Sequence, residues 1–158
     1  MTRLISIFVL VLLIAAPAFG PALAQQSLVG TYKIVSHEVE REGTAIRPLG
    51  EAPHGYLVLT PTRYIAFYTG GDRKFGVSEP EKAALLDTLT GVSGVYRVEG
   101  SKIIISVDAS WTEAWTGKDQ VRNWTLSGNR LTLTSDPVPS AMESSKTSII
   151  RAVWEKIE

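Results

Sequence analysis

The sequence contains no cysteine and only two histidines, His37 and His54, among its 158 residues. Without cysteine the chain can form no disulfide bond, and it lacks the residue that carries the lipid anchor of bacterial lipoproteins. Zinc sites are built largely from cysteine and histidine, so this composition predicts no metal centre. Stability is therefore expected to come from buried apolar side chains and hydrogen bonds, which a domain of this size can supply without cross-links.

An excess of charge of either sign is also missing. The chain has 16 basic and 16 acidic residues, and neither kind gathers into a long run or a stripe. Nucleic acids and anionic membrane surfaces both attract proteins through clustered basic side chains. The sequence therefore predicts neither of them as a partner.

Catalytic and cofactor-binding motifs are scarce as well. The chain has no phosphate-binding loop and no dinucleotide fingerprint, so no cofactor is predicted. The stretch "GVSGV" at residues 91–95 resembles the Gly-x-Ser-x-Gly elbow of hydrolases, but it lacks the final glycine and precedes a strand-like run. We therefore assign no catalytic residue, and we expect a non-enzymatic role ahead of an enzymatic one.

The first residues have the pattern of a secretory signal peptide. Arg3 is followed by an apolar run from Leu4 to Phe19, and the segment ends with "ALA" at residues 22–24. The alternative, a membrane-spanning helix, needs roughly 20 apolar residues, and Pro17 and Gly20 interrupt this shorter run. We predict a signal peptide at residues 1–24, cleaved after Ala24, and one domain at residues 25–158. The protein is then periplasmic or secreted, without a stable membrane anchor.

The rest of the chain reads as short strands separated by turns. Apolar and polar residues alternate in "GTYKIVSHEVE", "GYLVLT", "RYIAFYTG", "SGVYRVEG", "KIIISVDA", "QVRNWTLSG", "NRLTLTS" and "SIIRAVWEKI". Two turns, at residues 98–102 and 126–131, have the composition of tight hairpins. Strands of this number and spacing are typical of an antiparallel barrel or sandwich. The stretch "SDPVPSAMESSKTS" is expected to form a long surface loop before the last strand.

One segment breaks this alternation and predicts a single short helix near residues 79–90. Ser78 is suited to cap it, Pro80 falls in its first turn, and Glu81 completes a capping box. Ala84, Leu85 and Leu89 lie at helical spacing. The helix is expected to cover one mouth of a barrel or to pack beside its wall.

Strict alternation along the first strand assigns its side chains to two faces. If Tyr32 and Ile34 point inward, His37 points to solvent and Glu38 shares the inner side with Tyr32. His54 follows a proline at a strand entrance, where a turn or rim position is expected. A register error of one residue would reverse each of these assignments.

The tryptophans form two groups. Trp124 lies on a strand with Arg122 on the same face, which predicts a wall residue. Trp111 and Trp115 lie in the connection before that strand, four residues apart. They are interpreted either as a lid over a cavity or as a hydrophobic plug beneath the loop.

Three separated blocks carry a family resemblance. They are "LVGTYKIVS" at residues 28–36 with the proline- and glycine-rich Pro48 to Gly55, then "WTGKDQVRNWTLSGNRLTLTS", and last "AVWE" at residues 152–155. Together they resemble the lipocalin-like domain family of bacteria and fungi. The resemblance implies a calycin-type antiparallel barrel around a central cavity. The family usually has tryptophan where Tyr32 stands, near the closed end of the barrel and against an arginine from a late strand; Arg122 is the candidate for that partner.

These observations combine into one prediction of fold and function. The fold class is all-β: a closed antiparallel lipocalin-like barrel of about 8–10 strands with one short helix. We expect it to bind a small, largely apolar molecule of unknown identity in its cavity. The alternatives are an isomerase- or cyclase-type enzyme using the same cavity, with Glu38 as acid or base, and a packed barrel that acts as an interaction module. The predicted ligand-binding residues are Tyr32, Tyr64, Tyr96, Trp111, Trp115, Arg122 and Trp124.

Overall fold

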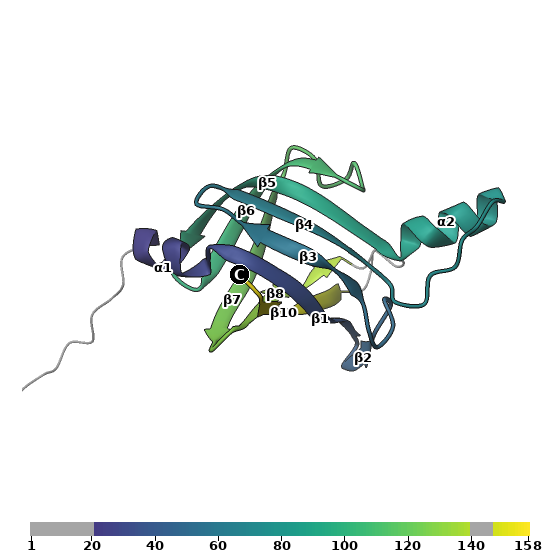
Figure 1. The fold of residues 1–158 in the computed structure, drawn as a ribbon, viewed down its shortest axis with the longest axis horizontal. Helices are drawn as coiled ribbons and strands as arrows, with labels where there is room; N and C mark the ends of the chain where they lie inside the picture. The colour runs from purple at the N-terminus through teal and green to yellow at the C-terminus, as the bar shows by residue number, and fades with distance from the viewer. Residues whose placement is uncertain (1–20, 140–146) are drawn as a thin grey trace, which may run out of the picture.

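The alternating segments form one antiparallel sheet that closes on itself. The computed structural model describes residues 21–139 and 147–158. Eight strands close the barrel because β1 pairs with both β3 and β10, while β2 and β9 are short additions to β1 and β10. This confirms the predicted fold class (Figure 1). The strands are β1 Gly30–Arg41, β2 Thr44–Ile46, β3 His54–Leu59, β4 Arg63–Thr69, β5 Leu89–Glu99, β6 Lys102–Ser110, β7 Asp119–Ser127, β8 Arg130–Ser135, β9 Val138–Pro139 and β10 Thr147–Lys156.

A bulge in β1 changes which of its residues face inward. The register against β10 shifts between Ile34 and Ser36, so one extra residue enters β1. Tyr32 and Ile34 lie inside, and beyond the bulge His37 is also inside, with 8% of its surface exposed. The expectation that His37 points to solvent was therefore wrong. Glu38 lies outside, paired with Arg47 at 2.8 Å, and does not share the inner side with Tyr32.

Both predicted hairpins are present. Glu99 pairs with Lys102 around Gly100, and Ser127 pairs with Arg130 around Gly128. The two glycines have φ values of +57° and +60°, in the left-handed region that disfavours side chains. The predicted surface loop before β10 is only partly described, because residues 140–146 lie outside the described residues.

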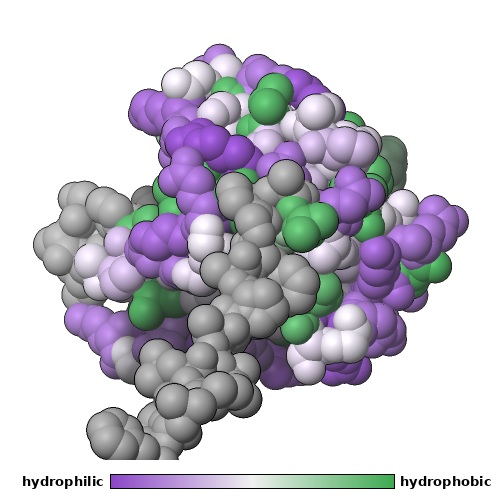
Figure 2. Space-filling view, turned by 90° about the vertical axis from the view of Figure 1, so that its left-hand side faces the viewer, coloured by the Kyte–Doolittle hydropathy of each residue, from purple (hydrophilic) through white to green (hydrophobic). Residues whose placement is uncertain are grey.

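One end of the barrel is closed by α1, which spans Pro21–Leu28. Leu28 is fully buried, and its carbonyl accepts a 2.8 Å hydrogen bond from the hydroxyl of Tyr32. The side chain of Gln25 donates to the carbonyl of Pro61 at 2.7 Å. The helix contains Ala24, so the predicted cleavage site falls within it; cleavage itself stays a prediction. Figure 2 looks at this end, where the visible described residues are mainly hydrophilic, with hydrophobic residues scattered among them.

The ring of Tyr32 has a different cation beside it from the one that the resemblance suggested. The Nζ atom of Lys156 lies 5.8 Å from its ring centroid, and the same Nζ donates to the carbonyl of Val29 at 2.7 Å. Lys156 is the residue of β10 that pairs with Tyr32 in the sheet. Arg122 instead lies 5.7 Å from the ring of Trp115, so its assignment as the partner of Tyr32 was wrong.

The predicted helix is α2, Glu79–Asp87. Its start is the expected one: Ser78 is the N-cap, and the Glu81 carboxylate accepts the Ser78 backbone N–H at 2.9 Å. None of its residues is buried, and it projects from the end of the barrel opposite α1 (Figure 1). Leu89 belongs to β5 rather than to this helix. Among the described residues, no helix has both the length and the apolar character that a membrane span requires.

Candidate functional site

The barrel is hollow in the half away from α1. A cavity of about 770 Å³ lies between the strands and reaches the loops at that end. Its volume falls in the range of small-molecule pockets. The wall comes mainly from the second half of β1 and from the parts of the other strands beside it: His37, Val39, Tyr64, Tyr68, Thr90, Val92, Ile105, Gln120, Arg122, Leu133, Ser148, Ile150, Ala152 and Trp154.

His37 is a buried histidine in this wall. Burial, and secondarily the positive charge of Arg122, lower the pKa of His37 to about 4. The imidazole is therefore neutral near pH 7. Its Nδ1 atom is buried and has no hydrogen-bond partner, while its ring lies 5.6 Å from that of Tyr68. A buried polar atom without a partner costs free energy, and a ligand that bonds to it can recover that cost.

Two tyrosines from β4 face the same space. Tyr64 and Tyr68 are 7% and 8% exposed, and burial raises the pKa of both hydroxyls. Both therefore stay protonated near neutral pH and can donate hydrogen bonds. Tyr68 shares a side-chain hydrogen bond with Thr90, and its ring meets that of Trp154 edge-on at 5.2 Å. These contacts fix the Tyr68 ring in the wall.

Arg122 places a positive charge in the cavity. Its Nη1 atom donates to the carbonyl of Val121 at 2.8 Å, and its Nη2 atom makes a longer 3.4 Å contact to Oε1 of Gln120. The guanidinium lies beside the ring of Trp115. Across residues 21–139 and 147–158, no carboxylate forms an ion pair with it.

The mouth is formed by two connections. Trp111 and Trp115, between β6 and β7, pack edge to face at 4.6 Å and both line the cavity. The backbone N–H of Trp111 donates to the carbonyl of Gly91 at 2.8 Å, which ties this loop to β5. Leu49, from the connection between β2 and β3, also lines the mouth and is only 4% exposed. Its carbonyl accepts the N–H of Gly71, so two loops hold each other there.

The seven predicted binding residues divide between the two ends of the barrel. Four of them line the cavity: Tyr64, Trp111, Trp115 and Arg122. Tyr32 and Tyr96 pack in the closed half, where the Tyr96 hydroxyl donates to the carbonyl of Thr60 at 2.9 Å. Trp124 is partly buried against the core and is not among the lining residues.

Several lining residues were not among the predicted ones. Tyr68 shares a strand face with Tyr64, and Gln120 shares one with Arg122, so alternation could have added both. Trp154 belongs to the core, with 1% of its surface exposed, and it also lines the cavity. His37 could be assigned to the cavity only with knowledge of the bulge in β1, which turns its side chain inward. Ser148, with a buried and unpartnered Oγ atom, has no sequence signal that we can identify.

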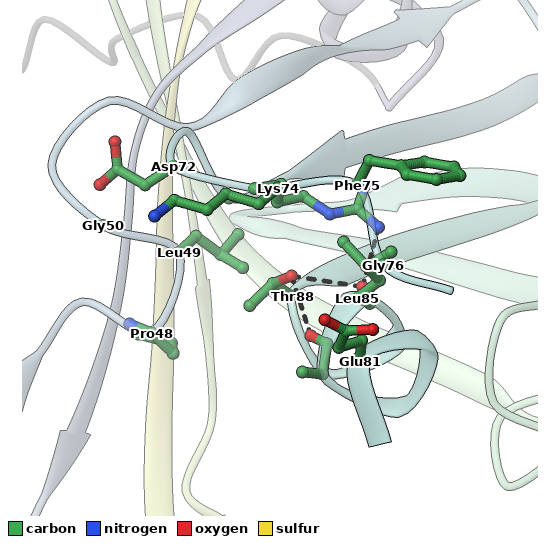
Figure 3. A pocket seen from close by; sticks show the side chains of 13 residues that line it. Pro48, Leu49, Gly50, Asp72, Lys74, Phe75, Gly76, Glu81, Leu85 and Thr88 are labelled. Atoms are coloured by element: carbon green, nitrogen blue, oxygen red, sulfur yellow. Dashed lines mark hydrogen bonds between the residues drawn. The ribbon is translucent and has the colours of Figure 1, made fainter. Parts of the chain in front are cut away.

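A second pocket of about 520 Å³ lies outside the barrel, between the loop before α2 and the helix itself (Figure 3). Several of its polar groups are paired. The Thr88 hydroxyl contacts the carbonyls of Ala84 and Leu85 at 3.2 Å, and Arg73 donates to the carbonyl of Leu85 at 2.9 Å. Phe75 on its border is 91% exposed. We regard this pocket as secondary to the barrel cavity.

Neither a metal site nor a serine nucleophile emerges from the described part of the chain. No group of three or more His, Asp or Glu side chains there could hold a metal ion. The Ser93 hydroxyl donates to the exposed carboxylate of Asp108 at 2.6 Å, which places it on the outside of the barrel. His54 is exposed at the start of β3, consistent with the expected rim position.

An antiparallel barrel that is closed at one end and hollow at the other defines the class of β-barrels that enclose a small ligand. The chain belongs to the lipocalin-like domain family, whose model matches residues 29–157. A comparison with curated proteins finds no match.

Proposed function

We propose that this protein is exported and binds a small, largely apolar molecule in the barrel cavity. The observation that carries the proposal is the cavity of about 770 Å³, walled by aromatic and aliphatic side chains. A barrel packed solid, as a pure interaction module requires, has no such space. The buried and unpartnered Nδ1 of His37 and Oγ of Ser148 give a ligand two polar contacts among these side chains.

No second function is advanced. The alternative of an isomerase- or cyclase-type enzyme assigned the role of acid or base to Glu38. Glu38, the candidate, lies on the outside and pairs with Arg47. Among the described lining residues the one carboxylate is Asp87, at the end of α2.

Native mass spectrometry of the protein purified from its own host tests both parts of the proposal. We expect a co-purified small molecule that is released on denaturation, and a chain whose first residue is Gln25. Full-length chain in the purified protein would contradict export. Absence of any bound molecule, together with no ligand-dependent change in tryptophan emission across fatty acids, terpenes and aromatic compounds, would contradict binding.

The mouth tryptophans can be tested by substitution, with Trp124 as the matched control. Trp111→Ala combined with Trp115→Ala should remove most of a ligand-dependent change in emission, because these two rings line the cavity. Trp124→Phe should leave the change in place, since Trp124 lies outside the lining. If the double variant keeps the full emission response, the mouth assignment fails.

A further inference from the structure

Arg122 is a charged residue in the wall of the cavity. Among the described lining residues the one acidic side chain is Asp87, at the end of α2. Arg122 lies on the inner face of β7, and within the described part of the chain its polar contacts are to the neutral oxygens of Val121 and Gln120. A partly desolvated charge without a counter-ion is costly, and proteins normally pair it.

The wall groups whose pKa values Arg122 affects, His37, Tyr64 and Tyr68, carry no negative charge at neutral pH. Outside the lining, the exposed carboxylate of Asp136 is bonded to Asn123 and Lys102, and Arg122 is the last of the causes that lower its pKa. Burial keeps the Tyr64 and Tyr68 hydroxyls protonated, and the low pKa of His37 keeps its ring neutral. Each of these side chains can donate a hydrogen bond, because neutral imidazole has one N–H and each phenol one O–H. This part of the cavity therefore presents the charge of Arg122 beside neutral donors, an arrangement that suits an anion.

The guanidinium has donors left over. An arginine carries five N–H groups in a planar fork that matches a carboxylate in a two-point contact. The contacts to Val121 and Gln120 use two of them. The fork is also held against the ring of Trp115, so little side-chain freedom remains to be lost when a ligand arrives.

We propose that the ligand of this barrel is a carboxylic acid with an apolar body, whose carboxylate is bound by Arg122. This inference rests on the proposed function and adds the chemical class of the ligand. A singly charged carboxylate balances Arg122, whereas a phosphate ester brings a second negative charge into the apolar wall. The ring of Trp115 lies beside the same guanidinium and packs edge to face against Trp111, and these two rings contact the apolar body.

Titration calorimetry with matched probes tests the inference. Two pairs share an apolar body and differ in the polar group: dodecanoate with dodecanol, and naphthylacetate with naphthylethanol. We expect at least one acid to bind about 10- to 100-fold more tightly than its alcohol, the usual strength of a hydrogen-bonded charge. Arg122→Met should abolish that difference while leaving the affinity for the alcohol within about threefold. Arg122→Lys should retain part of it, because the charge stays and the fork is lost.

The control variant is Arg151→Met, which removes an exposed arginine from β10 and should change neither affinity. If Arg122→Met does not fold, as judged by circular dichroism, the comparison of acid with alcohol on the unaltered protein and on Arg122→Lys decides the question. Equal affinity for acid and alcohol overturns the inference and leaves the proposed function standing. Tighter, Arg122-dependent binding of dodecyl phosphate than of dodecanoate overturns the carboxylate assignment. If neither acids nor alcohols bind, the inference falls, and native mass spectrometry with the wider ligand screen decides the proposed function.

Discussion

The two ends of the barrel are made from the same strands but differ in whether their buried polar groups are hydrogen-bonded within the protein. At the end closed by α1, the hydroxyls of Tyr32 and Tyr96 donate to backbone carbonyls, and Lys156 bonds to Val29. At the open end, His37 Nδ1 and Ser148 Oγ are buried without a partner.

The difference separates stability from binding. A buried donor that is bonded within the protein contributes to folding, whereas one left without a partner costs stability and can be repaid by a ligand. The correspondence is not complete, because the buried Nε1 of Trp124 is also without a partner and lies outside the cavity lining. Substitutions in the closed half should therefore change stability first, and those in the open half should change binding or pH dependence first.

The largest effect is expected from Tyr32→Ala in the closed half. Tyr32 is fully buried, so the change removes a large ring from the core and a hydrogen bond to Leu28. We expect a loss of about 4 kcal/mol in the free energy of unfolding, measured by urea denaturation. Lys33→Ala, which alters the exposed neighbour on the same strand, should cost less than about 0.5 kcal/mol. Equal effects of the two variants would contradict the assignment of a tightly packed closed end.

A smaller effect is expected in the open half, where His37 makes the free energy of unfolding depend on pH. The pKa of His37 is about 4 in the folded protein and is near its ordinary 6.5 in the unfolded chain. Between these values the unfolded chain binds more protons, so the free energy of unfolding falls as the pH falls. His37 alone should lower it by about 2 kcal/mol between pH 7 and pH 5. The charged group that faces it is Arg122, which acts in the same direction.

His37→Gln is the control for this pH effect. The glutamine does not titrate, so the variant should lose that part of the pH dependence. Carboxylates whose pKa values are lowered, such as those of Asp108 and Asp136, release their contribution at lower pH and are common to both proteins. An unchanged slope between pH 7 and pH 5 in the variant would show that His37 is not buried in its neutral form.

The barrel could be predicted from the sequence because alternation, hairpin turns and the capping box are local signals. The inner face of β1 was mispredicted because strict alternation was assumed along the whole strand, across the bulge between Ile34 and Ser36. A parity change does mark it: Tyr32 and Ile34 occupy even positions and Val39 an odd one, although all three are buried. Inward-facing apolar residues on both parities of one strand require an extra residue between them. That reading places His37 inside.

The position of Arg122 along its strand could not be predicted in the same way. Alternation put it on the inner face, but which end of the barrel it reaches depends on how β7 pairs with β6 and β8. Arg122 pairs with Ile103 and Ser135. The family resemblance assigned Arg122 to Tyr32, which lies at the closed end. Long-range register, rather than side-chain type, decides whether this arginine stabilises the closed end or lines the cavity.

The smallest effects provide the sharpest comparison between the two ends, because each removes one buried hydroxyl. Tyr32→Phe keeps the ring and leaves the buried carbonyl of Leu28 without its donor, so we expect a loss of about 1 kcal/mol in the free energy of unfolding. Ser148→Ala removes a hydroxyl that has no partner, so stability should stay within about 0.5 kcal/mol or rise. Denaturant titrations of both variants beside the unaltered protein measure the two differences. If Ser148→Ala lowers the free energy of unfolding as much as Tyr32→Phe does, the Ser148 hydroxyl has a partner within the protein, which would contradict the proposed difference between the two ends.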